Sequence, residues 1–152
     1  MKFILSRELG RLSKWLRILG FDTVYVNQEN TAGLVMQALR EDRLIITRNH
    51  RLAASGRLKI FLLKSEKLQD QLSEILKGLK LSINNDMMFS RCIICNVELE
   101  RIEKEQVRLK VPEYVFKTQE NFIACPKCKR IYWSGTHWGN VAQTLKEIGV
   151  AL

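Results

Sequence analysis

Short apolar runs alternate along the chain with longer segments in which apolar residues recur every three or four positions. The runs, which are typical of buried strands, are 2–5, 23–26, 43–47 and 58–63. The segments with helical periodicity are 7–19, 31–40, 50–55 and a stretch that Ser65 could cap. Because such apolar strands alternate with helices, the pattern predicts an α/β fold, a buried parallel sheet with helices on both faces.

Two helical segments carry the clearest apolar stripes. The stripe of the first consists of Leu9, Leu12, Leu16 and Leu19, and Gly20 then ends the helix. The stripe after Ser65 consists of Leu68, Leu72, Ile75, Leu76 and Leu79. A last helix is expected at 140–148, with Val141, Leu145 and Ile148 facing inward.

The alternation stops at 82–90, where polar residues and methionines replace the periodic pattern. We expect this segment to link two domains. The first is the α/β domain at 1–83. The second, at 88–152, is a small metal ribbon with an aromatic segment and a helix at its end.

All four cysteines lie in the second part of the chain, as two Cys-x-x-Cys pairs. Cys92 and Cys95 form the first pair, Cys125 and Cys128 form the second, and 29 residues separate the pairs. Each pair can present both sulfurs to one ion, so the two pairs complete a tetrahedral four-sulfur site. We expect a structural zinc, because no ligand position is left open. Iron is the alternative, since the spacing also resembles rubredoxin, although Asn96 and Lys129 stand where rubredoxin knuckles usually carry glycine.

Composition limits the class of protein. Hydrophobic residues make up 46% of the chain, which is enough for a core. The chain has no run of about 18 apolar residues, and its N-terminal apolar run is too short for a secretory signal. We therefore expect a cytoplasmic protein without a membrane segment, and a reducing cytosol favours a metal over disulfides at the cysteines.

Positive charge is concentrated in the first part of the chain. The net charge is +9, and residues 1–85 hold 15 Lys and Arg against 8 Asp and Glu. This excess favours an anionic partner, most often nucleic acid. The candidate RNA-binding residues, on the first helix and around the end of the third strand, are Arg7, Arg11, Lys14, Arg17, Arg48 and Arg51. The alternative for the helix is an ordinary solvated face.

Carboxylates are scarce at the ends of the predicted strands, where an open parallel sheet places its chemistry. A metal-dependent nuclease needs two or more carboxylates there to hold Mg²⁺ or Mn²⁺. The acids near these ends are Glu8, Asp22, Glu29 and Glu66. Each is more simply explained as a solvated surface charge, so these are weak catalytic candidates.

Three stretches together resemble a known family. They are Leu9-Gly10-Arg11-Leu12 with Trp15-Leu16-Arg17-Ile18-Leu19-Gly20-Phe21-Asp22, Ile46-Thr47-Arg48-Asn49, and Val111-Pro112 with Cys125-Pro126-Lys127-Cys128 and Ile131-Tyr132-Trp133-Ser134-Gly135-Thr136-His137-Trp138. From Phe3 to Trp138 the chain resembles the Mut-seven carboxy-terminal RNase family. The resemblance implies a PIN-like nuclease fold followed by a zinc ribbon, and an RNA-cleaving metalloenzyme.

The acids that this resemblance implies are replaced. Ser6 and Asn49 stand where aspartates are expected after the first and third strands, and Thr31-Ala32-Gly33 stands where an acidic pair opens the second helix. We therefore predict an RNA-binding protein with weak or lost nuclease activity, which needs Mg²⁺ or Mn²⁺ only if activity is retained. The alternatives are an active RNase that uses other carboxylates, a protein or ribonucleoprotein interaction module and, more distantly, an iron redox protein.

Aromatic residues follow the last cysteine. Tyr132, Trp133 and Trp138 could stack RNA bases. Packing of the ribbon against the α/β domain is the favoured role for Tyr132 and Trp133. His137 could hydrogen-bond near the metal and His50 could contact phosphate, and neither has a recognisable nucleophile partner.

Overall fold

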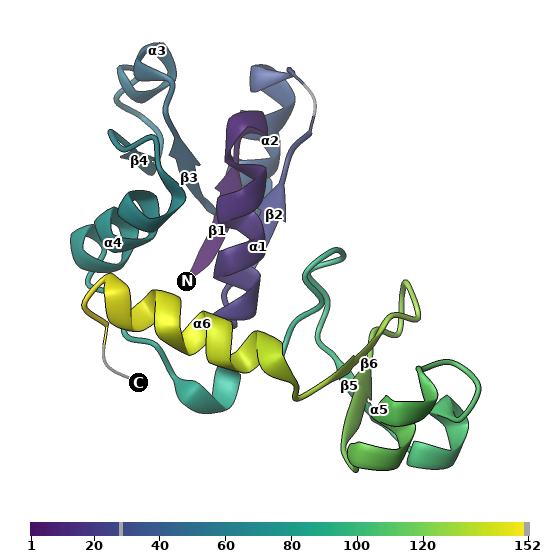
Figure 1. Cartoon of the computed structure of the whole chain (residues 1–152). Coiled ribbons are helices and arrows are strands. Elements are labelled where there is room, and N and C mark those ends of the chain that lie inside the picture. The colour runs from purple at the N-terminus through teal and green to yellow at the C-terminus, as the bar shows by residue number, and fades with distance from the viewer. Residues whose placement is uncertain (28, 151–152) are drawn as a thin grey trace.

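The structure, a computed structural model, describes residues 1–27 and 29–150, without the side chains of residues 136–138. Its first part is a four-stranded parallel sheet in the order β2-β1-β3-β4. The strands are β1 (Lys2–Leu5), β2 (Asp22–Tyr25), β3 (Leu44–Thr47) and β4 (Ile60–Leu62). The helices between them are α1 (Gly10–Ile18), α2 (Thr31–Glu41), α3 (His50–Ala53) and α4 (Leu68–Gly78). The α/β prediction is confirmed (Figure 1).

Helices cover both faces of the sheet because successive strand residues point to opposite sides. On one face, Phe3 and Leu5 of β1 pack with the buried leucines of α1 and α4. On the other face, Ile4 packs with Leu34 and Ala38 of α2. The predicted stripe of the first helix is buried along its whole length, and Gly20 follows it with a left-handed φ of 90°.

Two local predictions need correction. The first helical segment begins with a short 3-10 helix, Arg7–Leu9, before α1 starts at Gly10. Ser65 does not cap α4, which starts at Leu68 after Lys67 and has no side-chain cap. The Ser65 backbone N–H instead donates to Glu74 from the second turn of α4, at 3.0 Å. That carboxylate ties the end of β4 to the helix.

The second part is a smaller antiparallel sheet in the order β5-β6-β7. Its elements are the 3-10 helices Asn85–Met87 and Lys104–Val107, the strands β5 (Glu100–Ile102), β6 (Phe122–Ala124) and β7 (Ile131–Trp133), and the helix α5 (Glu113–Thr118). Val107, Val115 and Phe122 form its small core. Trp133 packs edge-on against Phe122, with ring centroids 6.4 Å apart. Trp133 therefore has a packing role, as predicted. It packs within the ribbon, however, and not against the α/β part.

The last helix, α6 (Thr136–Glu147), returns to the first part of the molecule. Figure 1 shows it passing across the ends of α1 and α4. Val141 and Leu145 are buried in the same core as the α1 leucines, and Ile148 packs beside them. The division into 1–83 and 88–152 stays a prediction. Two parts of the second segment share the core of the first: α6, and Met88 with Phe89 at the start of the segment. No helix in the described part of the chain is long and apolar enough to cross a membrane.

Candidate functional site

Parallel strands end at one edge of the sheet, and a cavity of about 180 Å³ opens at that edge. We call it the strand-end cleft. Its walls come from the segment after β1, the start of α2 and the segment after β3. They consist of Ser6, Arg7, Glu8, Glu29, Asn30, Thr31, Leu34, Thr47, Asn49 and Leu52. The structure thus brings together Ser6, Asn49 and Thr31, the first residue of the stretch at which the resemblance implies an acidic pair.

Glu8 places one carboxylate in this cleft. Its Oε1 accepts hydrogen bonds from Ser6 Oγ at 2.6 Å and from the Arg48 backbone N–H at 3.2 Å. Burial acts to raise the pKa of Glu8, but the hydrogen bonds from Ser6 and from backbone N–H groups outweigh it and lower the pKa below its ordinary value. Glu8 is therefore ionised at neutral pH and bridges the ends of β1 and β3.

Glu29 brings a second carboxylate to the rim of the cleft. Its Oε1 lies 2.5 Å from Nη1 of Arg7, and both side chains are largely exposed. An exposed pair of this kind contributes little stability, so either partner can exchange it for another charged group. The cleft therefore has two acids, and both are engaged by groups of the chain itself.

The other two acidic candidates lie elsewhere. Glu66 follows β4 and pairs with Nη2 of Arg48 at 2.9 Å. Asp22 opens β2, in register with Lys2, so it lies at the opposite, amino edge of the sheet. Its Oδ1 accepts from Nη1 of Arg43 and Nδ2 of Asn96, both at 2.7 Å. Asp22 therefore does not lie near the carboxyl ends of the strands, and the expectation of that position was wrong.

Two neutral residues at the cleft act as helix caps. Asn49 Oδ1 accepts from the backbone N–H groups of Arg51 and Leu52, at 3.0 and 3.3 Å, and so caps α3. Asn30 Oδ1 accepts from the Gly33 N–H at 2.9 Å and caps α2. Among the residues that the structure describes, the one group of three or more side chains placed to hold a metal is the set of four cysteines.

Basic side chains surround the cleft. Arg7 lines it, Arg48 is half-buried beside it and Arg51 is exposed on α3. Arg11 and Lys14 lie exposed on α1, away from the leucine stripe. The candidate RNA-binding residues did not include Lys64 and Lys67, which are exposed where the chain leaves β4. Their position directly after the fourth predicted strand is the sequence feature that could have identified them.

Arg17 differs from the other candidate RNA-binding residues because it is buried, with 7% of its surface exposed. Its Nε donates to the Thr23 carbonyl at 2.9 Å, and its Nη1 donates to the carbonyls of Ile93 and Ile94 at 2.8 and 2.9 Å. A guanidinium held in this way is not available to phosphate. We therefore leave Arg17 out of the proposed RNA surface.

The four cysteine sulfurs lie within 4.8 Å of one another. The two turns share one geometry: in each, the N–H of the second cysteine lies 3.4 Å from the sulfur of the first, Cys95 to Cys92 and Cys128 to Cys125. A four-sulfur set suits zinc or iron. Asn96 and Lys129 follow the turns with left-handed φ angles of 66° and 65°, a conformation that glycine adopts freely. The missing glycines therefore do not argue against iron.

Tyr132 reaches this centre from β7. Its hydroxyl lies 3.2 Å from the Cys92 sulfur. Burial acts to raise the pKa of Cys92, but hydrogen bonds from Tyr132 and from the backbone N–H groups of Cys95 and Ile94 lower it to about 6. The tyrosine thus favours the thiolate that a metal needs. Its predicted packing role stays a prediction. The side chains of His137 and Trp138 lie outside the described residues.

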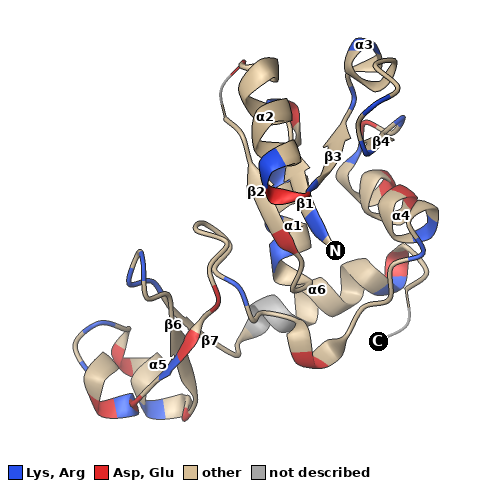
Figure 2. Ribbon diagram, turned by 180° about the vertical axis from the view of Figure 1, so that it is seen from behind, with Lys and Arg blue, Asp and Glu red and all other residues tan. Residues whose placement is uncertain are grey.

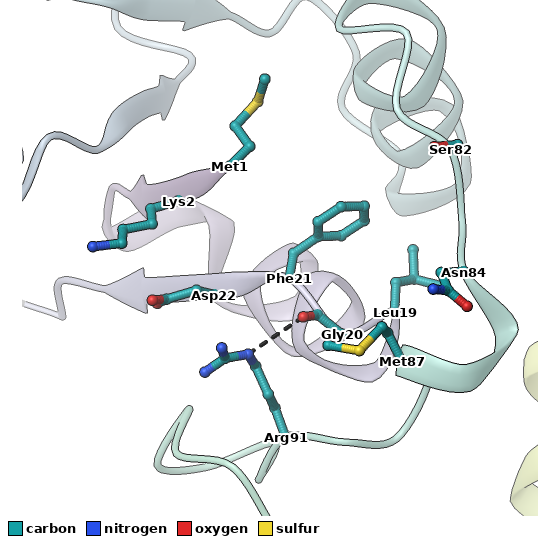
Figure 3. Close-up of a pocket in the computed structure, with 10 residues that line it drawn as sticks. All are labelled: Met1, Lys2, Leu19, Gly20, Phe21, Asp22, Ser82, Asn84, Met87 and Arg91. Carbon is teal, nitrogen blue, oxygen red and sulfur yellow. Dashed lines mark hydrogen bonds between the residues drawn. The ribbon is translucent and has the colours of Figure 1, made fainter.

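The first cysteine turn is docked on the α/β part. Asn96 Oδ1 accepts from the Thr23 backbone N–H at 2.9 Å, and Phe89 N–H donates to the Ile18 carbonyl at 2.7 Å. Arg91 Nε donates to the Gly20 carbonyl at 3.3 Å, as Figure 3 shows. A cavity of about 360 Å³ adjoins this junction. Its one carboxylate, Asp22, is already bound by Arg43 and Asn96, so we do not assign it a function.

Comparison with known proteins supports one family. The model of the Mut7-C RNase domain matches residues 1–145, which is nearly the whole chain. Neither a comparison with curated proteins nor one with solved structures gives a match. The family model, the parallel sheet and the four-cysteine centre agree with one another, and the chain belongs to the Mut7-C RNase domain family.

Proposed function

We propose that this protein binds RNA at the strand-end cleft and cleaves it weakly or not at all. One observation carries the proposal: the segments after β1 and β3 bring a hydroxyl, Ser6, and an amide, Asn49, to the cleft, and basic side chains stand around it. Neutral ligands bring no charge that gathers divalent cations. The absence of two aspartates also removes a repulsion of phosphate. RNA binding is therefore retained where cleavage is weak or lost.

The rim supplies the contacts that RNA binding needs. Arg7, Arg48 and Arg51 stand around the cleft, and Arg11 and Lys14 extend the positive surface along α1. Each phosphate contact releases condensed counterions, so affinity falls steeply with salt. In this account the cysteines hold a structural zinc, and Mg²⁺ or Mn²⁺ matters only to residual cleavage.

A binding measurement tests the proposal. We expect Arg48→Gln/Arg51→Gln to lower the affinity for single-stranded RNA and to reduce the slope of log affinity against log salt by about one. Fluorescence anisotropy across a salt series measures both. Lys77→Gln/Lys80→Gln is the matched control, because these exposed lysines near the end of α4 carry the same charge. Equal losses in both variants would show that RNA responds to the overall charge and not to the cleft, which would contradict the proposal.

A second candidate is an active RNase, and one observation favours it: Glu8 and Glu29 both line the strand-end cleft. A divalent cation there would have to replace the Ser6 and Arg48 N–H donors on Glu8 and the Arg7 partner of Glu29. Metal-dependent cleavage by the unaltered chain that Glu8→Gln/Glu29→Gln abolishes would establish this candidate in place of the first.

A further inference from the structure

The two cysteine turns have the same geometry but different environments, since the first is docked on the α/β part and the second is exposed. We call Cys92–Cys95 the first knuckle and Cys125–Cys128 the second knuckle. The first encloses Ile93 and Ile94, whose carbonyls accept from the buried Arg17. The second encloses Pro126 and Lys127 and is followed by Lys129 and Arg130, all four of which are exposed. In Figure 2, basic residues mark the turn between β6 and β7, which projects away from the α/β part.

The second knuckle has no acid to balance its charge. Residues 121–135 contain three cations, Lys127, Lys129 and Arg130, and no Asp or Glu. Four other cations of the ribbon are paired: Arg91 with Glu98, Lys104 with Glu120, Arg108 with Glu105 and Lys117 with Glu113. Arg101 and Lys110 are exposed single cations that, like the knuckle cations, form no ion pair among the described residues. Within the described residues, no ion pair forms at the three knuckle cations. The second knuckle is therefore the place in the ribbon where three such cations stand within four consecutive residues.

The backbone of the second knuckle is held in place. The Cys125 N–H donates to the Arg130 carbonyl, and the Lys129 N–H donates to the Cys125 carbonyl, both at 2.9 Å. A bound metal would add a further constraint through the cysteines. Cations on a fixed turn lose less backbone freedom on binding an anion than cations on a mobile loop do.

We propose that the second knuckle is a phosphate-binding loop that contacts the RNA backbone outside the strand-end cleft. The inference rests on the proposed RNA binding and extends it to a second surface. It assigns different tasks to the two knuckles: the first docks on the α/β part, and the second holds RNA. An RNA long enough to reach both surfaces gains affinity that a short RNA cannot gain.

Another role for these cations is to compensate the metal centre. Four thiolates around one divalent ion carry a charge of about −2, which nearby cations would stabilise. In that case a variant without these cations would lose its metal faster. Its RNA affinity would equal that of a control variant from which the same charge is removed elsewhere. Metal retention must therefore be measured beside RNA binding.

The test compares Lys127→Gln/Lys129→Gln/Arg130→Gln with Lys77→Gln/Lys80→Gln/Lys146→Gln, which removes the same charge from exposed lysines of α4, its C-terminal turn and α6. The probes are oligouridylates of increasing length, and metal content is followed during chelation. For long oligouridylates we expect the knuckle variant to reduce the salt slope by about two, as three lost phosphate contacts on a single strand imply. Short oligouridylates should bind both variants alike.

Three results would overturn the inference. The first is a knuckle variant that binds long oligouridylates as well as the control variant does, whether or not it loses metal faster. The second is a loss of affinity that is the same for short and long probes. The third is an unaltered chain that binds no RNA, which would overturn the proposed function as well. If Arg48→Gln/Arg51→Gln weakens binding and the knuckle variant does not, the proposed function stands and the inference alone fails.

Discussion

At the scale of single residues, Arg17 shows how one side chain joins the two parts of the molecule. Its guanidinium donates hydrogen bonds to one carbonyl of β2 and to two carbonyls of the first knuckle. Thr23 is bonded twice in this junction, since its N–H donates to Asn96 and its carbonyl accepts from Arg17. A helical periodicity assigns Arg17 to a polar face and does not reveal that a distant segment covers that face.

We expect Arg17→Met to lower the free energy of unfolding by about 2–4 kcal/mol, because it removes the donor of one buried and two partly buried carbonyls. Chemical denaturation measures this loss. Arg11→Met is the control, since Arg11 is exposed on the same helix and should change stability by no more than about 0.5 kcal/mol. Equal effects of the two substitutions would show that the Arg17 contacts contribute nothing.

For the cleft residues, the sequence predicted the position better than the role. Ser6 and Asn49 follow β1 and β3, and parallel strands bring their ends to one edge, so their proximity was expected. The capping role of Asn49 and the hydrogen bond from Ser6 to Glu8 depend on side-chain geometry that spacing does not encode. Asp22 was misplaced because it was assigned to the strand-end edge, whereas it opens β2 at the other edge.

At the scale of elements, β2 is an outer strand of the sheet, and the first knuckle covers its free edge. An exposed edge strand invites pairing with other chains, and proteins cover or interrupt such edges. Here Asn96 takes the outward N–H of Thr23, and Asp22 at the start of β2 holds the Asn96 side chain. A bound metal would fix the knuckle that makes these contacts.

Metal removal should therefore loosen the α/β part next to the knuckle. In hydrogen exchange, we expect the Thr23 amide to lose about tenfold or more of its protection when a chelator removes the metal, because its acceptor lies on Asn96. The Leu63 amide, which donates to the Thr47 carbonyl at 2.8 Å, serves as the internal reference. Unchanged protection at Thr23 would show that the knuckle keeps its place without metal.

The strands and helices themselves were largely predictable because buried faces leave a periodic pattern. The leucines of α1 and α4 recur at helical steps, and each predicted strand of the sheet is found within about two residues. The pattern did not predict β5, β6 and β7, because three-residue strands in a metal ribbon owe their place to the cysteine turns and to a core of a few side chains. The start of α4 was missed because no side chain caps it.

At the scale of the whole molecule, α6 and the first knuckle attach the ribbon to the α/β part at two points. Val141 and Leu145 enter the main core, and Arg17 and Asn96 join the knuckle to α1 and β2. The second knuckle projects away from the α/β part (Figure 2). The basic residues around the strand-end cleft and those of this knuckle are thus the two surfaces that our account assigns to RNA.

The central claim is that the cleft has lost catalysis through its neutral residues and has kept RNA binding. Ser6→Asp/Asn49→Asp would return two carboxylates beside Glu8. The fold should tolerate the change at Asn49, because aspartate also accepts from the Arg51 and Leu52 N–H groups. The change at Ser6 places like charges close together, and a divalent cation would relieve their repulsion.

Cleavage of a labelled single-stranded RNA with Mg²⁺ or Mn²⁺ tests this claim most directly. The unaltered chain is compared with Ser6→Asp/Asn49→Asp and with Ser82→Asp/Asn85→Asp, which adds the same charge at exposed linker positions. We predict little cleavage by the unaltered chain and the linker variant, and a metal-dependent gain in the cleft variant. Robust metal-dependent cleavage by the unaltered chain, with no gain in the cleft variant, would contradict the account.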